Sequence, residues 1–68
     1  MTFVYTRKEK KGRDGKTYIL ERRSDRPFTF EYYVIYWTDD GKHLYTCAGY
    51  NSRSSAYKAF KKIPEAEN

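Results

Sequence analysis

The stretch that most constrains the fold of this chain is "FTFEYYVIYWT", residues 28–38. β-Branched and aromatic residues fill it, and these side chains favour strands. Pro27, just before it, has no amide hydrogen to donate to a ladder, so it marks a break. The turn "DDGK" follows at 39–42, where Gly41 supplies the positive φ that hairpin loops need. "HLYTCAGY", residues 43–50, returns as a second strand, and we predict an antiparallel hairpin.

A second hairpin is predicted before this one. "TFVYTRK" (2–8) and "TYILERR" (17–23) have the composition of strands. The Asp14–Gly15 dipeptide between them is a favoured hairpin turn, and Gly12 adds backbone flexibility. "SDRP" (24–27) then separates the two hairpins.

A helix is predicted after the second hairpin, over about residues 53–63. Asn51 or Ser52 caps its start, and Pro64 prevents it from continuing. Its apolar residues recur at the i, i+3, i+4, i+7 spacing of one buried stripe; they are Ala56, Ala59, Phe60 and Ile63. We therefore expect an α+β fold, a three- to four-stranded antiparallel sheet of two hairpins with one C-terminal helix packed on one face. The whole is expected to be a single domain over 1–64, with a frayed tail at 65–68.

The faces of the second hairpin depend on its turn. On the last strand, the alternation places Leu44, Ala48 and Tyr50 toward the helix and His43, Tyr45 and Cys47 away from it. A two-residue turn puts Tyr33, Ile35 and Trp37 in the core and turns Phe30, Tyr32, Val34 and Tyr36 outward. A three-residue turn with a bulge exchanges these two sets. In both cases one helix covers one face only, and an aromatic face remains as a candidate interface, represented by Tyr32, Tyr36 and Tyr45.

The sequence contains few of the residues that catalysis and metal binding need. Cys47 is the single cysteine and His43 the single histidine, which excludes an internal disulfide and a Cys/His zinc site. The two lie four residues apart, so they share a strand face without touching. We expect no enzyme activity, no metal and no cofactor. Met1–Tyr5 is followed by charge rather than by a long apolar stretch, and no apolar run is long enough to cross a bilayer, so we expect a cytoplasmic protein with no membrane partner.

Positive charge is concentrated in the first hairpin. The net charge is +5, and the segment from Arg7 to Arg26 holds nine basic residues against four acidic ones. Lys58, Lys61 and Lys62 add a second group on the helix. Such clustering is typical of proteins that bind polyanions. The predicted nucleic-acid contacts are Arg7, Lys8, Lys10, Lys11, Arg13, Lys16, Arg22, Arg23, Arg26, Lys58, Lys61 and Lys62.

The segment "FEYYVIYWTDDGKHLYTCAGYNSRSSAYKAF", residues 30–60, resembles the arm-site DNA-binding domains at the N-termini of tyrosine recombinases (integrases), which are similar to AP2-like DNA-binding domains. Those domains join an aromatic strand, a hairpin with Asp, Gly and Lys, and a G-F-x-T-K-x-E-A entry into the helix. The matching residues here are Asp39, Gly41, Lys42, Gly49, Tyr50, Ser52, Arg53 and Ala56, while Ser55 stands where that family often has Glu. The resemblance implies a sheet that enters the major groove of DNA. The join at 49–56 is similar to that of the YegP-type domain as well, and this second resemblance implies a homodimer that hides the aromatic face.

Two classes of function remain open from the sequence. The first is a small non-catalytic protein, encoded by a phage or mobile element, that binds nucleic acid through the basic hairpin and the sheet, with duplex DNA favoured over RNA. It would then work in the cytoplasm of a host cell. The alternative is a small phage-type inhibitor or adaptor, of the anti-CRISPR kind, that binds a protein or a nucleoprotein complex through its aromatic sheet face.

Overall fold

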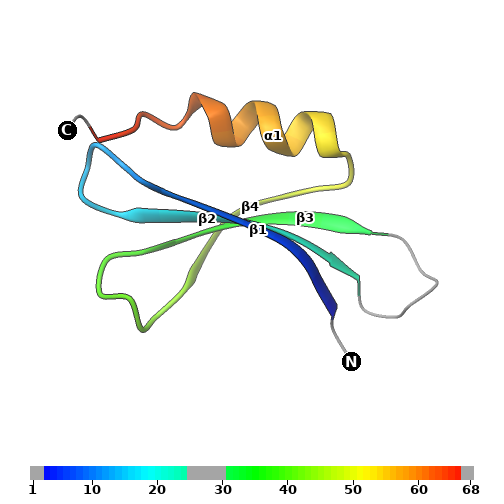
Figure 1. Ribbon diagram of the computed structural model, residues 1–68, viewed down its shortest axis with the longest axis horizontal. Coiled ribbons are helices and arrows are strands. Elements are labelled where there is room, and N and C mark those ends of the chain that lie inside the picture. Colours follow the sequence, from blue (N-terminus) through cyan, green and yellow to red (C-terminus); the bar gives the residue numbers. More distant parts are fainter. Residues whose placement is uncertain (1–2, 25–30, 67–68) are drawn as a thin grey trace.

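Four antiparallel strands and a C-terminal helix make up the part of the chain that the structure, a computed structural model, describes: residues 3–24 and 31–66. The sheet has the order β1-β2-β3-β4, and the helix lies over one face (Figure 1). The α+β fold predicted from the sequence is confirmed. The elements are β1 (Phe3–Lys11), β2 (Thr17–Ser24), β3 (Tyr32–Thr38), β4 (Tyr45–Tyr50) and α1 (Arg53–Lys62).

The β1–β2 hairpin turns tightly around Gly15, whose φ of 89° requires a glycine. The Asp14 carboxylate accepts a hydrogen bond from the Lys16 amide (3.0 Å), which closes the turn locally. The chain end then docks on this hairpin. Glu65 forms a β-bridge with Gly12, and the amide of the following residue donates to the Lys11 carbonyl (2.9 Å). Residues 65 and 66 therefore pair with the hairpin instead of fraying as the sequence had suggested.

The β3–β4 loop is longer than the predicted turn. The Asp40 carboxylate accepts hydrogen bonds from the amides of Lys42 (2.8 Å) and His43 (2.9 Å), and it lies 2.7 Å from Nδ1 of His43. These bonds hold the pKa of Asp40 well below its usual value, and the two contacts with His43 are the largest causes. Because they organise the loop as far as His43, β4 begins at Tyr45, two residues later than expected.

A β-bulge in β4 changes the predicted faces. Ile35 pairs with Ala48 but Tyr36 pairs with Thr46, so Cys47 has no partner in the register. The extra residue shifts the alternation by one, and Tyr45 pairs with Trp37 on the helix side. The prediction that Tyr45 points away from the helix while Leu44 faces it is therefore wrong.

The main hydrophobic cluster lies between the helix and the middle of the sheet, and Ile19 and Val34 are buried on the opposite face. Ile35 is 1% exposed and Ala56 is not exposed at all, and they pack with Leu20 and Tyr33. The side chains around them are Tyr18, Tyr50, Tyr57, Ala59, Phe60 and Ile63. The faces of β3 are those expected for a two-residue turn, with Tyr33 and Ile35 inside, although the loop itself is longer. The bulge lies in β4, so the alternation of β3 is unbroken.

The helix lies over the half of the sheet formed by β3 and β4. Ser52 caps its start by accepting a hydrogen bond from the Ser55 amide (3.1 Å), and the helix packs on β3 and β4. Beyond its end, the Pro64 carbonyl accepts from the Arg13 amide (3.0 Å), which carries the chain across to the β1–β2 hairpin. In Figure 1 the β3–β4 loop diverges from the helix. Two parts of the helix-side face thus lie beside the helix instead of under it, one next to β1 and one at the loop end of β3 and β4.

Candidate nucleic-acid interface

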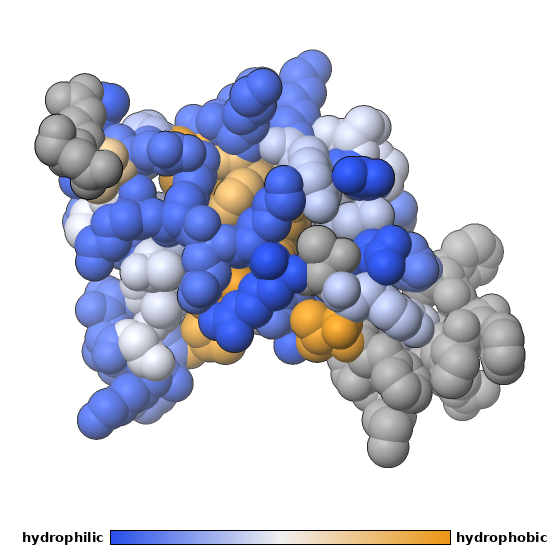
Figure 2. All heavy atoms as spheres, in the orientation of Figure 1, coloured by the Kyte–Doolittle hydropathy of each residue, from blue (hydrophilic) through white to orange (hydrophobic). Residues whose placement is uncertain are grey.

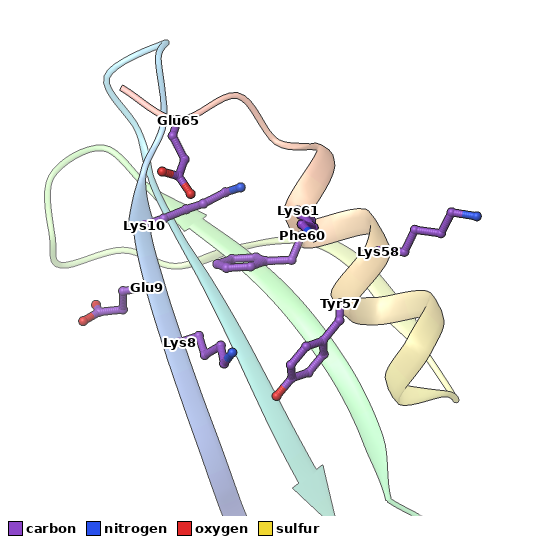
Figure 3. A pocket seen from close by; sticks show the side chains of 8 residues that line it. All are labelled: Lys8, Glu9, Lys10, Tyr57, Lys58, Phe60, Lys61 and Glu65. Atoms are coloured by element: carbon purple, nitrogen blue, oxygen red, sulfur yellow. The ribbon is translucent and has the colours of Figure 1, made fainter. Parts of the chain in front are cut away.

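A groove of about 740 Å³ runs between β1 and α1 (Figure 3). We call it the β1–α1 groove. Seen in the orientation of Figure 1, the molecule presents mainly hydrophilic side chains, with apolar surface in small patches between them (Figure 2). The groove is lined by Lys8, Glu9, Lys10, Tyr57, Lys58, Phe60, Lys61 and Glu65.

The lysines of the groove come from two distant parts of the sequence. Lys8 and Lys10 alternate along β1 and stand opposite Leu20 and Tyr18, so both project from the helix side of the sheet. Lys58 and Lys61 are three residues apart, so they lie on one side of α1. The fold therefore brings the two predicted basic segments to the two edges of one groove.

Aromatic rings support the strand lysines. Lys8 Nζ lies 4.8 Å from the centroid of the Tyr57 ring, and Lys10 Nζ lies 4.9 Å from that of Phe60. Figure 3 shows these pairs pointing toward each other from β1 and α1. Lys10 Nζ donates to the Ile63 carbonyl (2.6 Å), one of the carbonyls left without a partner at the helix end. Arg53 lies over Tyr57 as well, at 5.0 Å. These cation–π contacts fix the strand lysines beside the helix while leaving their charge uncancelled.

The four lysines share the groove with two carboxylates, Glu9 and Glu65, but pair with neither. None of them forms an ion pair with any residue in the ranges that the structure describes. Glu9 borders the groove but points away from it in Figure 3 and pairs with Arg7 (3.2 Å). Glu65 also lines the groove, and its carboxylate makes no ion pair with these lysines. The groove is therefore a site of net positive charge.

The opposite face of the sheet, which we call the open face, has cations that are already paired. Besides Arg7 with Glu9, Arg23 Nε lies 3.0 Å from Glu21 Oε1, although the two are not aligned as a hydrogen bond. Arg23 also donates to the Tyr36 hydroxyl (2.5 Å) and stacks over its ring at 5.1 Å. These contacts leave less free positive charge on the open face than in the groove.

The predicted aromatic interface is divided between the two faces. Tyr32 and Tyr36 belong to the open face, since they pair with Arg23 and Ile19 across β2. Tyr45 lies on the helix side, where its ring stacks on Trp37 with centroids 4.5 Å apart. The bulge at Cys47 separates Tyr45 from the other two, and no periodicity in the sequence signals that bulge.

The remaining predicted cations are spread around the molecule. Arg22 pairs with Glu31 (3.6 Å) and lies over the Tyr5 ring, and Lys16 Nζ lies 4.3 Å from the Trp37 ring centroid. Lys11, Arg13 and Lys62 are exposed on β1, the turn and the helix respectively. Arg26 lies outside the described residues.

Sequence reasoning named the groove lysines but missed the two rings between them. Phe60 was assigned to the buried stripe of the helix, and Tyr57 was assigned no role. In the structure both are half-buried and border the groove. Their position beside the groove depends on where the helix lies relative to β1, which the helical period alone does not give.

Other kinds of site find no support in the described residues. Among them, no group of three His, Cys, Asp or Glu side chains is placed to hold a metal ion. No helix in the described ranges is long and apolar enough to cross a membrane. Comparison with known proteins finds no protein family, curated protein or solved structure that matches this chain.

Proposed function

We propose that this protein binds nucleic acid, DNA in the first instance, and does so without catalysis. The observation that carries the proposal is the β1–α1 groove, which is lined by Lys8, Lys10, Lys58 and Lys61, none of them with an ion-pair partner among the described residues. Lysines grouped in this way attract a phosphate backbone and release its counterions on binding. We therefore propose the groove as the DNA-binding surface, in place of the hairpin and the sheet predicted from the sequence.

The proposal is tested by measuring DNA affinity against salt. Removing the helix lysines in the double variant Lys58→Gln/Lys61→Gln is expected to weaken binding at low salt. Each lost phosphate contact should also make the slope of log K against log salt shallower by about 0.9 on duplex DNA. Fluorescence anisotropy of a labelled duplex, titrated at several salt concentrations, measures both quantities.

The matched control changes two lysines outside the groove, in the double variant Lys42→Gln/Lys62→Gln. Lys42 lies in the β3–β4 loop and Lys62 at the helix end, and both are exposed. The two double variants have the same net charge. A specific effect of the groove lowers affinity more in the first than in the second. The proposal is contradicted if the unmodified protein binds neither duplex nor single-stranded DNA at low salt.

A second candidate function is favoured by the open face. Its paired charges and its tyrosines, Tyr32 and Tyr36, resemble the mixed polar and aromatic composition of protein–protein interfaces. This is the surface that an inhibitor or adaptor of a protein or nucleoprotein complex would use. Absence of salt-sensitive DNA binding would favour this candidate over the first.

A further inference from the structure

A three-layer stack stands at the loop end of β3 and β4, outside the β1–α1 groove. Lys16 Nζ lies 4.3 Å from the Trp37 ring centroid, and the Tyr45 ring stacks on Trp37 at 4.5 Å with an interplanar angle of 22°. β2 and β4 flank β3 on its two sides. Lys16, which precedes β2, and Tyr45, in β4, therefore cover opposite faces of the indole. The order of the layers is cation, indole, phenol.

The outer layer of this stack is available to a ligand. β4 is an outer strand of the sheet, and Tyr45 is 48% exposed although one face of its ring rests on Trp37. The exposed area therefore belongs to the other face and the ring edge. A second planar group fits against it in the offset parallel arrangement that aromatic rings prefer.

The charge of this surface favours a planar group carried by an anion. Lys16 belongs to the stack itself, and the unpaired lysines of the β1–α1 groove lie on the same side of the sheet. We propose that Tyr45 stacks with an unpaired base of single-stranded nucleic acid while the lysines hold its phosphates. Bases inside a duplex have both faces covered by their neighbours, so an unpaired base is required. The inference rests on the proposed function and narrows its substrate to a strand with exposed bases.

Trp37 provides a direct readout, because it is the only tryptophan in the chain. A short single-stranded DNA is expected to change Trp37 fluorescence saturably as it binds, whereas the blunt duplex of the same sequence leaves the fluorescence unchanged. Tyr45→Leu keeps an apolar strand residue but removes the ring, and it should weaken single-strand affinity by roughly tenfold, as loss of one stacked base does. Tyr45→Phe keeps the ring and should keep the affinity.

The control is Tyr32→Leu, which removes a tyrosine from the open face and should leave single-strand binding unchanged. Equal losses in Tyr45→Leu and Tyr32→Leu would overturn the inference. So would salt-sensitive DNA binding that leaves Trp37 fluorescence unaltered, a result under which the proposed function itself stands. If neither form of DNA binds at low salt, both proposals fail, and Tyr45 is left as a contact for a protein partner.

Discussion

At the scale of single residues, the tip of the first hairpin depends on one close contact. Gly12 is buried, and a Cβ placed there would come within 2.6 Å of the Tyr18 ring and 2.7 Å of the Asp14 carboxylate. The space that glycine leaves lets the Tyr18 hydroxyl donate to Asp14 at 2.6 Å. This hydrogen bond, with a smaller contribution from burial, raises the pKa of Tyr18 to about 12. The same bond, together with the one from the Lys16 amide, lowers the pKa of Asp14 below its usual value.

The raised pKa of Tyr18 predicts a loss of stability at alkaline pH. An unfolded tyrosine loses its proton near pH 10, whereas the folded one keeps it until about pH 12. Between these values the folded state binds more protons than the unfolded state, so stability falls as pH rises. The contribution of Tyr18 is complete below pH 10 and disappears by about pH 12. The variant Tyr18→Phe lacks this contribution at every pH.

The measurement is the free energy of unfolding of both proteins by denaturant, from pH 8 upward. The difference between them is expected to be constant up to about pH 9 and to shrink between pH 10 and about pH 12. Taking the difference removes the contributions that all other ionising groups make to the free energy of unfolding in this range. A difference that stays constant up to pH 12 contradicts the prediction.

At the scale of elements, the sequence predicts what local chemistry determines. The positive φ of Gly41, the cap at Ser52 and the apolar period of the helix each act over a few residues, and each is found where expected. The face of Tyr45 was not predictable in this way. It depends on a bulge at Cys47 that is set by how β4 pairs with β3 and how the Asp40 hydrogen bonds extend the loop. Pairing of this kind is a property of two strands together.

The helix cap gives an element-scale prediction. Ser52 Oγ accepts from the Ser55 amide, so Ser52→Ala leaves one helix donor without its partner. We expect a loss of about 1 kcal/mol in the free energy of unfolding, measured by denaturant titration. Ser54→Ala is the control. It lies inside the first helical turn, where alanine is the better helix former, and should be neutral or slightly stabilising. Equal losses in the two variants would show that the cap is not the cause.

At the scale of the whole molecule, the two sides of the sheet differ in free charge. Adjacent residues on β1 show this most simply. Arg7 belongs to the open face and pairs with Glu9, while Lys8 enters the β1–α1 groove beside Tyr57. The sequence predicted the excess of positive charge in this hairpin, because a sum of charges needs no fold. It did not predict which cations remain unpaired, because that depends on where carboxylates and the helix come to lie.

Because of this difference in free charge, single substitutions can show whether the groove or the open face of the sheet is the DNA-binding surface. The resemblance to recombinase arm-site domains implies docking through the sheet, whereas the unpaired lysines favour the groove. Arg7→Gln and Lys8→Gln each lower the net charge from +5 to +4, and they change neighbouring residues of one strand. If the groove binds DNA, Lys8→Gln should weaken affinity and make the salt slope shallower by about 1, while Arg7→Gln changes both little.

Both variants are expected to fold, because Lys8 is exposed and a surface ion pair such as that of Arg7 contributes at most about 1 kcal/mol. Thermal unfolding checks this before affinities are compared. Fluorescence anisotropy with one labelled DNA, at low and moderate salt, then gives the comparison. A larger loss in Arg7→Gln assigns DNA to the open face and contradicts the groove. Equal losses mean that net charge alone governs binding, in which case neither face holds a defined site.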